Sequence, residues 1–392
     1  MDNFLTTEFA GVSSVQAVAS PIHIAIDVGS TQTRSCTYTA NAEIDNTIVL
    51  DSNYEVLNRS IEHVAAVDNQ VISGLELTIT DLSADKKVDP MFTEAHIIKG
   101  NLLSSVTTSR VITASSASKI DQEATYLNIV STVALQILQQ YVVHGQPSNE
   151  IQVNLTVALP PEDTRFKQRL DKFMERLVGS YSVEFKRFGV IAKFAISDKL
   201  NIISEPEAVA VYQTVERQLE NEEDSVVCVL DIGGRSTGIT FIDNQHLLLD
   251  SCATVPWGGS KLVAFLGREL GNSLNIQEPQ PQRLIKALST GEFKIGSQRV
   301  DITAQLNAVK KEFAGLIFSE LTRAIDLNGI QMQNISKVFC SGHTFGEAPG
   351  SPSLMNAIAA QFQARCSFTE FSRIENENPI LMGLAYHGIM HA

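Results

Sequence analysis

The stretch Ile22-His23-Ile24-Ala25-Ile26-Asp27-Val28-Gly29-Ser30-Thr31-Gln32-Thr33-Arg34 carries the strongest local pattern in the chain. Its short apolar run, residues 24–28, predicts a buried strand that ends beside an acid, Asp27. Gly29 lets the backbone turn tightly and approach a ligand closely. Hydroxyl side chains and the positive charge of Arg34 follow, so the pattern suits a nucleotide phosphate tail with hydrated Mg²⁺. Taken alone, the stretch fits an ordinary hairpin turn about equally well.

The same unit occurs a second time in the chain. Val226-Val227-Cys228-Val229-Leu230-Asp231-Ile232-Gly233-Gly234-Arg235-Ser236-Thr237-Gly238-Ile239-Thr240 again has an apolar strand, an acid and a glycine–hydroxyl turn. Two copies of one supersecondary unit predict two similar domains, each with its own phosphate loop.

Composition limits the possible functions. The chain has 392 residues, enough for two or three domains, and a formal net charge of −14. Such a charge argues against direct nucleic-acid binding, so a DNA target would require an adaptor protein. No run of about 18 apolar residues predicts a membrane span, and residues 1–20 look like a flexible extension rather than a signal peptide. The five cysteines are widely spaced, which favours reduced, buried thiols in the cytoplasm.

Strand and helix patterns alternate along the rest of the chain. Apolar spacings of three and four predict a helix over residues 121–143. Residues 51–110 are irregular, and we interpret them as an inserted small lobe outside the main sheet. Further strands are expected at residues 34–39, 47–50, 151–159, 181–203 and 337–340, and further helices at residues 162–177, 205–220, 261–270, 282–289, 301–327 and 380–390.

The order of these features resembles the actin, DnaK-type chaperone and sugar kinase superfamily. Two acid–glycine hairpins, a helix that opens at Glu205 and a Ser341-Gly342 turn after a late strand carry the resemblance over residues 22–390. Within the superfamily the chain is most similar to bacterial actin-like filament proteins of the ParM type, which move plasmids apart. Two segments look like theirs, Val153-Asn154-Leu155-Thr156-Val157-Ala158-Leu159-Pro160 and Leu288-Ser289-Thr290-Gly291-Glu292-Phe293-Lys294-Ile295.

The resemblance implies an actin-like α/β fold. Two similar α/β domains would each have a mixed five-stranded sheet and flanking helices, with a nucleotide cleft between them. Domain I would span residues 21–204 after the extension 1–20, with its small lobe at about 46–110. Domain II would span residues 205–375, with a small lobe around 280–300, and a hinge helix at 376–392 would return to domain I.

The resemblance also implies site residues. The catalytic residues would be Glu205, which positions the attacking water, and Asp27 and Asp231, which hold Mg²⁺ through water. The implied nucleotide contacts are Gly29, Ser30, Thr31 and Arg34 in the first loop, Gly233, Gly234, Arg235 and Ser236 in the second, Ser341, Gly342 and His343 in an adenosine loop, and Glu292 and Lys294 near the ribose.

Four positions depart from the family pattern. Arg34 replaces a lysine, and Gly238 replaces a histidine or aspartate, so hydrolysis either is slow or depends more heavily on Glu205. Arg235 either stabilises the γ-phosphate or points to solvent or to Glu207. His343 either stacks on the adenine or is a surface turn residue.

The implied function is a bacterial actin-like ATPase that polymerises head-to-tail with ATP (or GTP) and Mg²⁺ and segregates plasmid DNA through a DNA-binding adaptor. It would act in the cytoplasm, without a membrane and without direct contact with nucleic acid. The alternatives are a non-polymerising ATPase, such as a chaperone-like scaffold, or a small-molecule kinase of the same fold. The chain shows no clear sugar-binding motif, and we expect no appended peptide-binding domain.

Overall fold

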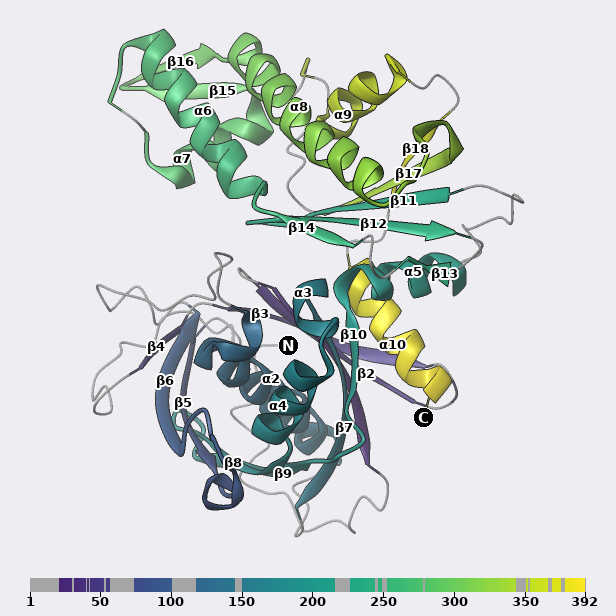
Figure 1. Cartoon of the computed structure of the whole chain (residues 1–392). Coiled ribbons are helices and arrows are strands. Elements are labelled where there is room, and N and C mark those ends of the chain that lie inside the picture. Colours follow the sequence, from purple (N-terminus) through teal and green to yellow (C-terminus); the bar gives the residue numbers. More distant parts are fainter. Residues whose placement is uncertain are drawn as a thin grey trace. The chain divides into compact units, whose positions relative to one another are not determined.

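The computed structural model describes residues 21–29, 32–39, 41, 43–52, 54–56, 74–100, 118–144, 150–215, 226–243, 246–248, 252–277, 279–342, 350–351, 353–365, 369–374 and 378–391. The chain divides into two compact units. Unit 1 comprises Met1–Tyr212 and Ile380–Ala392, and unit 2 comprises Gln213–Pro379. Each unit has its own sheet and its own hydrophobic core (Figure 1).

Unit 1 is built on one mixed sheet with ten described strands in the order β3-β2-β1-β7-β9-β8-β5-β6-β4, with β10 also beside β7. These strands are β1 (Ile22–Val28), β2 (Gln32–Tyr38), β3 (Ile44–Asp51), β4 (Tyr54–Val56), β5 (Gly74–Asp81), β6 (Glu94–Gly100), β7 (Ile151–Leu159), β8 (Gly179–Phe185), β9 (Val190–Ile196) and β10 (Asn201–Ser204). The first three form the predicted antiparallel meander, and β7 runs parallel to β1 and β10.

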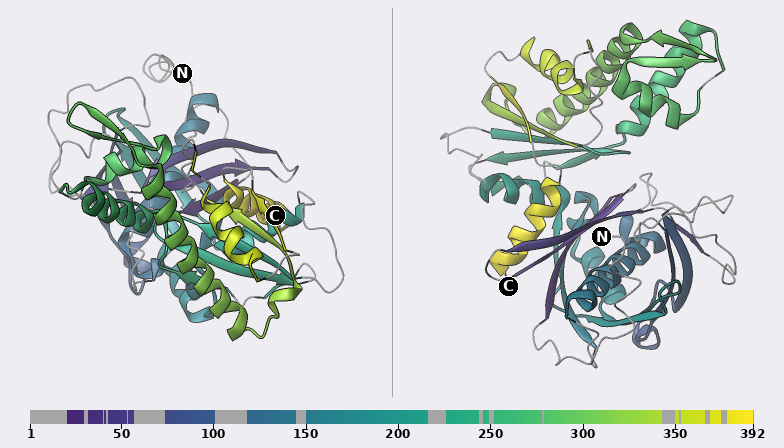
Figure 2. Two further views of the ribbon diagram at one scale, coloured as in Figure 1. Left: turned by 90° about the horizontal axis from the view of Figure 1, so that it is seen from above. Right: turned by 180° about the vertical axis from the view of Figure 1, so that it is seen from behind.

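The helices of unit 1 follow the predicted periodicity closely. They are α2 (Glu123–His144), α3 (Pro161–Thr164), α4 (Lys167–Leu177), the start of α5 (Glu205–Val215) and α10 (Pro379–His391), with short 3-10 helices η2 (Ala84–Lys86) and η4 (Lys119–Asp121). The sheet curls around α2, which contacts strands on both sides of it, β1, β2 and β3 as well as β5, β8 and β9 (Figures 1 and 2). This enclosure explains why α2 is buried around its whole circumference rather than on one stripe.

The interpretation of residues 51–110 as a lobe outside the main sheet is wrong for the strands described there. β5 pairs antiparallel with β8, and β6 and β4 continue the same sheet. The alternating residues Leu75, Leu77 and Ile79 are buried in the same core as β7 and α2. One apolar face therefore continues across these strands, and the sheet has more strands than the predicted five.

The predicted helix over residues 162–177 is interrupted. α3 ends at Thr164 and α4 begins at Lys167, because Phe166 between them has an extended backbone with φ −112° and ψ 112°. The break allows Arg169, in the first turn of α4, to reach back to Asp163 in α3.

Unit 2 has a mixed sheet with six described strands in the order β13-β12-β11-β17-β18, with β14 beside β12. The strands are β11 (Val226–Ile232), β12 (Thr237–Asp243), β13 (His246–Leu247), β14 (Ala253–Val255), β17 (Ile335–Ser341) and β18 (Glu370–Arg373), and a separate hairpin contains β15 (Glu292–Ile295) and β16 (Gln298–Asp301). The helices are α6 (Gly259–Leu274), α7 (Pro281–Thr290), α8 (Thr303–Leu327) and α9 (Leu354–Gln363), with a 3-10 turn η6 (Met332–Asn334).

The two sheets repeat one topology, which confirms the predicted duplication. In each, an antiparallel hairpin (β1–β2 or β11–β12) is followed in the sheet by two parallel strands, β7 and β10 in unit 1 and β17 and β18 in unit 2. A helix follows the last of these strands in both cases, α5 after β10 and α10 after β18.

The predicted second domain began at residue 205, but α5 belongs to unit 1 as far as Tyr212. The reason is its packing against α10. A Cβ on Gly383 would lie 1.7 Å from the carbonyl oxygen of Ala208, so the two helices touch at a glycine. Tyr212 and Tyr386 stack nearby, with ring centroids 6.4 Å apart.

Two predictions from composition can be compared with the described residues. Cys36, Cys228, Cys252 and Cys340 are free, buried thiols, as expected, and Cys366 lies outside the described residues. A helix with the length and apolar character needed to span a membrane is absent from the described part of the chain. The extension 1–20 and the acidic stretch 220–224 also lie outside it.

Candidate functional site

The first acid loop begins where β1 ends. Asp27 is almost completely buried, at 4% exposure, and lies opposite Arg34 across the β1–β2 hairpin. Arg34 Nη1 is 3.6 Å from Asp27 Oδ2, and Arg34 Nη2 donates to Gln32 Oε1 at 3.1 Å. Arg34 is therefore the ion-pair partner of Asp27 in this structure, and its predicted contact with phosphate stays a prediction.

Gly29 closes the hairpin at a point where a side chain does not fit. A Cβ at this position would lie 2.5 Å from the carbonyl oxygen of Gln32. The hydroxyl of Ser52 donates to the carbonyl oxygen of Gly29 at 2.7 Å and so fixes the turn from β3. Ser30 and Thr31, the predicted phosphate contacts, lie outside the described residues.

Glu205 is the first residue of α5, directly after β10. Ser204 and Glu207 form a reciprocal capping box at this helix start, with Glu207 N donating to Ser204 Oγ at 3.2 Å and Ser204 N donating to Glu207 Oε2 at 3.3 Å. Because β1 and β10 flank β7 in parallel, their carboxyl ends meet at one edge of the sheet. The fold thereby brings Asp27 and Glu205 to the same edge, as the resemblance implied.

Lys119 joins this edge from a third element and was missed in the sequence analysis. Its ammonium donates to Glu205 Oε1 at 2.5 Å and to the carbonyl oxygen of Val28 at 2.7 Å. It comes from η4, the short turn before α2. The stretch that precedes it has no regular pattern, so nothing in the local sequence marked this lysine.

The electrostatic surroundings keep Lys119 charged. Burial lowers its pKa, but the carboxylates of Glu205, Asp27 and Asp163 together outweigh this effect, and the net pKa is raised. The described edge of unit 1 therefore holds two acids, Asp27 and Glu205, and two bases, Arg34 and Lys119.

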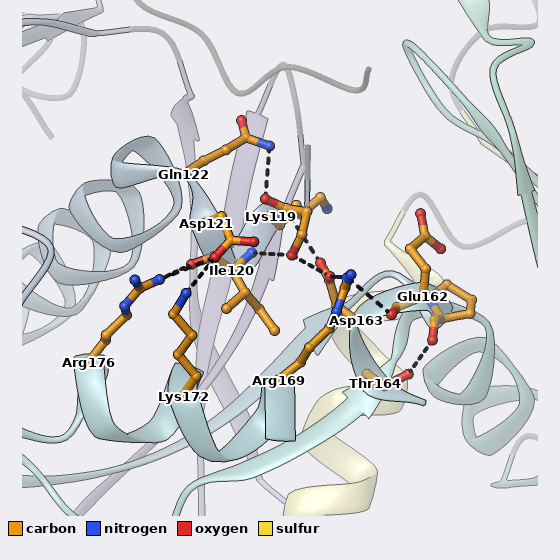
Figure 3. Close-up of polar contacts among 12 residues, drawn as sticks. Lys119, Ile120, Asp121, Gln122, Glu162, Asp163, Thr164, Arg169, Lys172 and Arg176 are labelled. Carbon is orange, nitrogen blue, oxygen red and sulfur yellow. Dashed lines mark hydrogen bonds and ion pairs between the residues drawn. The ribbon is translucent and has the colours of Figure 1, made fainter. Parts of the chain in front are cut away.

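The turn that carries Lys119 is held by several side chains (Figure 3). The completely buried carboxylate of Asp163 accepts from Ser118 Oγ at 2.5 Å, from the backbone N–H of Lys119 at 3.0 Å and from Arg169 Nη1 at 3.0 Å. On the other side, Arg176 Nη1 and the Tyr126 hydroxyl donate to the carbonyl oxygen of Ile120 at 3.0 and 2.7 Å.

The second acid loop begins where β11 ends. Asp231 lies opposite Ser341 of the parallel strand β17, and Ser341 Oγ donates to Asp231 Oδ1 at 2.5 Å. Gly342 follows with a positive φ of 121°, and a Cβ there would lie 2.1 Å from the carbonyl oxygen of Ile232. The structure thus brings together Asp231, Ser341 and Gly342, whereas His343 lies outside the described residues.

Backbone contacts with the start of α6 shape the turn from Gly233 to Ser236. Gly259 N donates to the carbonyl oxygen of Gly233 at 3.0 Å, and Ser260 N donates to that of Gly234 at 2.8 Å. Gly258 lies directly under the turn, where a Cβ would be 2.3 Å from the carbonyl carbon of Arg235. This role of the Gly258-Gly259 pair was not predicted from the sequence, although two adjacent glycines at the start of a helix are a visible signal.

Two of the departures noted in the sequence have defined positions. Gly238 pairs with Asp231 across the β11–β12 hairpin, so the position without an acidic or imidazole side chain lies beside the second acid. Arg235 is half-buried in the turn, and its proposed contact with the γ-phosphate stays a prediction.

Glu292 and Lys294 are on the separate β15–β16 hairpin, at the end of unit 2 away from β17 and β18 (Figures 1 and 2). Both side chains are exposed, and Glu292 Oε2 lies 3.3 Å from Arg299 Nη1. The structure does not bring them to the Asp231 loop, and their contact with a ribose stays a prediction.

The two loops fit the requirements of a nucleotide with Mg²⁺. Such an ion is bound through one or two carboxylates, with phosphates and water completing its octahedron. Each loop presents one acid at a strand end, and the glycine that leaves no room for a side chain is Gly29 in the turn after Asp27 and Gly342, at the end of the paired strand β17, beside Asp231. A metal ion held by protein side chains alone needs a group of three or more His, Cys, Asp or Glu residues. Within the described ranges no such group occurs.

Solved structures with the actin fold match nearly the whole chain. An archaeal actin homologue matches at 14% identity with a TM-score of 0.66, over 94% of this chain and 99% of its own. ParM from Bacillus thuringiensis, solved with ATP, matches at 12% identity and a TM-score of 0.59, over 95% and 98%. ParM from Clostridium botulinum, solved as a 15-stranded filament, matches at 14% identity and a TM-score of 0.62, over 95% and 99%.

No protein-family model matches the chain, and no curated protein does. At identities this low, the likeness to solved structures shows the fold alone. It confirms the predicted α/β class and its actin-like arrangement of two repeated sheets.

Proposed function

We propose that this chain, which has the actin fold, is a nucleotide-dependent filament protein that hydrolyses ATP (or GTP) as it assembles. The observation that carries the proposal is the duplicated acid–glycine hairpin. Each copy places its acid at the carboxyl end of a strand, and a glycine without room for a Cβ lies close to each acid, Gly29 in the first hairpin and Gly342 at the end of β17 next to the second. In unit 1 that edge also holds Glu205, a carboxylate suited to orient an attacking water or accept its proton.

The proposed roles divide between the loops. Asp27 and Asp231 would hold Mg²⁺ through water, and the ion, when bound, would neutralise charge on the phosphates. The turns after both acids would offer backbone N–H groups to the phosphate oxygens. Glu205 would orient water for in-line attack on the terminal phosphorus, and its place at the first position of α5 holds it at the strand edge.

Self-assembly is supported by the fold and by the neighbours. One of the matching structures is a ParM filament, and another ParM was solved with ATP. Head-to-tail contacts between identical subunits are heterologous and need not close, so they generate filaments. With a net charge of −14, the chain would reach plasmid DNA through a DNA-binding adaptor rather than by direct contact.

Sedimentation tests the filament. The purified chain at high concentration is centrifuged with ATP, GTP, ADP or no nucleotide, each with Mg²⁺, and light scattering is followed in parallel. We expect pelleting and scattering with a triphosphate and neither with ADP. Phosphate release without pelleting would instead indicate a non-polymerising ATPase, and phosphate transfer to an added small molecule would indicate a kinase.

Replacing Glu205 tests its part in hydrolysis. Glu205→Ala should reduce phosphate release by roughly 10²–10⁴-fold, the usual contribution of a positioned general base, and leave triphosphate-dependent pelleting in place. Glu184→Ala, which removes an exposed glutamate of unit 1, is the matched control. Unchanged hydrolysis in the Glu205 variant would contradict the assigned role.

A further inference from the structure

Lys119 has a place in unit 1 that the proposed function does not yet use. It lies on a turn far from the β1–β2 hairpin in sequence, yet its ammonium reaches the carbonyl oxygen of Val28, the residue directly before Gly29. The same ammonium donates to the carboxylate of Glu205. It therefore joins the start of the first loop to the carboxylate proposed to orient water.

We propose that Lys119 is the phosphate-binding cation of the first loop and that it distinguishes a nucleoside triphosphate from a diphosphate. The inference rests on the proposed function. A Lys ammonium has three N–H donors, and Lys119 uses two of them on described acceptors, Val28 and Glu205. Within the described part of the chain the third has no acceptor, and it would donate to a terminal phosphate oxygen at the loop, which places the cation between the phosphate and Glu205.

The charges around the loop favour Lys119 over Arg34 in this role. Arg34 is the obvious base of the hairpin, but it lies beside Asp27 and also donates to Gln32. Its guanidinium is therefore held along the β1–β2 pair, whereas the ammonium of Lys119 is hydrogen-bonded to the loop backbone at Val28. Lys119 is a compact charge on a flexible stem, and its side chain keeps 14% exposure at the loop.

The hydrogen bonds that fix the backbone around Lys119 also favour a phosphate-binding site over an incidental ion pair with Glu205. The carboxylate of Asp163 accepts a hydrogen bond from the backbone N–H of Lys119 (Figure 3). Arg176 and Tyr126 both donate to the carbonyl oxygen of Ile120. The backbone of the turn is thus held on both sides, and the ammonium itself is held by Val28 and Glu205. Preorganisation of this kind is what binding of a developing charge requires.

A gain in folding stability is a weak explanation for the presence of the Lys119–Glu205 ion pair. Removing two charges from water costs free energy that their attraction often only offsets. Both side chains are also partly open, at 14% and 22% exposure, which is the condition that allows a ligand to reach them.

Binding measurements with a non-hydrolysable ATP analogue and with ADP test the proposal. Lys119→Met should weaken binding of the triphosphate analogue by roughly 10–100-fold, the value of a charged hydrogen bond, and change ADP binding by about twofold or less. Lys119→Arg, which keeps the charge, should retain part of the preference for the triphosphate. Lys172→Met is the matched control, because it removes an exposed lysine that pairs with Asp121 on the same turn.

The outcomes are distinguishable. If Lys119→Met weakens binding of both nucleotides by the same factor, the ratio of the two affinities is unchanged and the role of Lys119 is overturned. A lysine with a purely structural role would give this result. Lys119→Gln provides a second neutral variant if Lys119→Met does not fold. Failure of the unsubstituted chain to bind either nucleotide would instead refute the proposed function.

Discussion

Unit 1 and unit 2 repeat one topology but differ in how deeply their ion pairs are buried. In unit 1, Lys87 Nζ lies 2.6 Å from Asp81 Oδ2, with the two side chains only 5% and 3% exposed. Asp163 and Lys119 add further buried or half-buried charges. In unit 2, by contrast, the ion pair between Lys337 and Glu370 lies at the surface, at 28% and 64% exposure.

The acid loops also differ. Asp27 lies near two charged side chains, Arg34 of β2 and Lys119 of η4, whereas the Ser341 hydroxyl donates a hydrogen bond to Asp231. The turn after Asp231 is shaped by backbone contacts with α6. The two copies of the hairpin therefore place different side chains around their acids.

The largest effect is expected from removing a buried charge in unit 1. Lys87→Met leaves Asp81 buried without its cation and also removes the hydrogen bonds from Lys87 Nζ to the Arg176 carbonyl and the Tyr181 hydroxyl. We expect the free energy of unfolding to fall by about 3–5 kcal/mol. Hydrogen exchange of β5 and β8 measures this loss within unit 1.

Lys337→Met is the matched variant in unit 2, where the pair is exposed and should contribute at most about 1 kcal/mol. Hydrogen exchange of the β17 amides measures this contribution to the free energy of unfolding. Losses of similar size in the two variants would refute the contrast between the units.

An intermediate effect is expected from adding one methyl group to the second loop. In Gly342→Ala the new Cβ would meet the carbonyl oxygen of Ile232 at 2.1 Å, and the backbone would stay at φ 121°. Steric overlap and backbone strain together should cost about 2–5 kcal/mol. The loss in the free energy of unfolding is measured for unit 2 by urea unfolding, with hydrogen exchange of its amides as the probe.

Gly296→Ala separates the two causes. Gly296 also has a positive φ, 58°, but no atom lies within 4 Å of an added Cβ. This variant introduces backbone strain without steric overlap, and its free energy of unfolding should fall by about 1–2 kcal/mol. If it were as unstable as Gly342→Ala, close packing around the second loop would not be the cause.

The smallest effect concerns acid sensitivity of unit 1. Burial, aided by the neighbouring His391, lowers the pKa of His387 on α10 to about 4 from its usual 6.5. The folded protein keeps this ring neutral below pH 6.5, whereas the unfolded chain takes up a proton there. Stability is therefore lost as the pH falls from 6.5 towards 4, by about 1 kcal/mol at pH 5.5.

His387→Gln should remove that part of the pH dependence. Thermal unfolding at pH 7.5 and 5.5 compares the variant with the unsubstituted chain. If the melting temperature falls equally between pH 7.5 and pH 5.5 in both proteins, His387 does not contribute to the pH dependence.

The sequence by itself determined the repeated strand–acid–glycine hairpins, most of the helices and the actin-like class. These features depend on local patterns. An apolar strand that ends at Asp27 or Asp231, a glycine at the turn and the 3.6-residue period of α2 are all visible within about 20 residues. Glu205 was named as a site residue by the family resemblance, to which a helix that opens at Glu205 contributes.

Only the tertiary structure decided which distant residues meet. The strands between residues 74 and 100 join the main sheet because their buried faces continue the core beyond β8, and an irregular sequence pattern does not reveal such pairing. Lys119 meets Glu205 and Val28 through a turn clamped by Asp163 and Arg176, residues that follow it by more than 40 positions. Contacts at that separation depend on how strands and helices pack, and no periodicity in one segment encodes them.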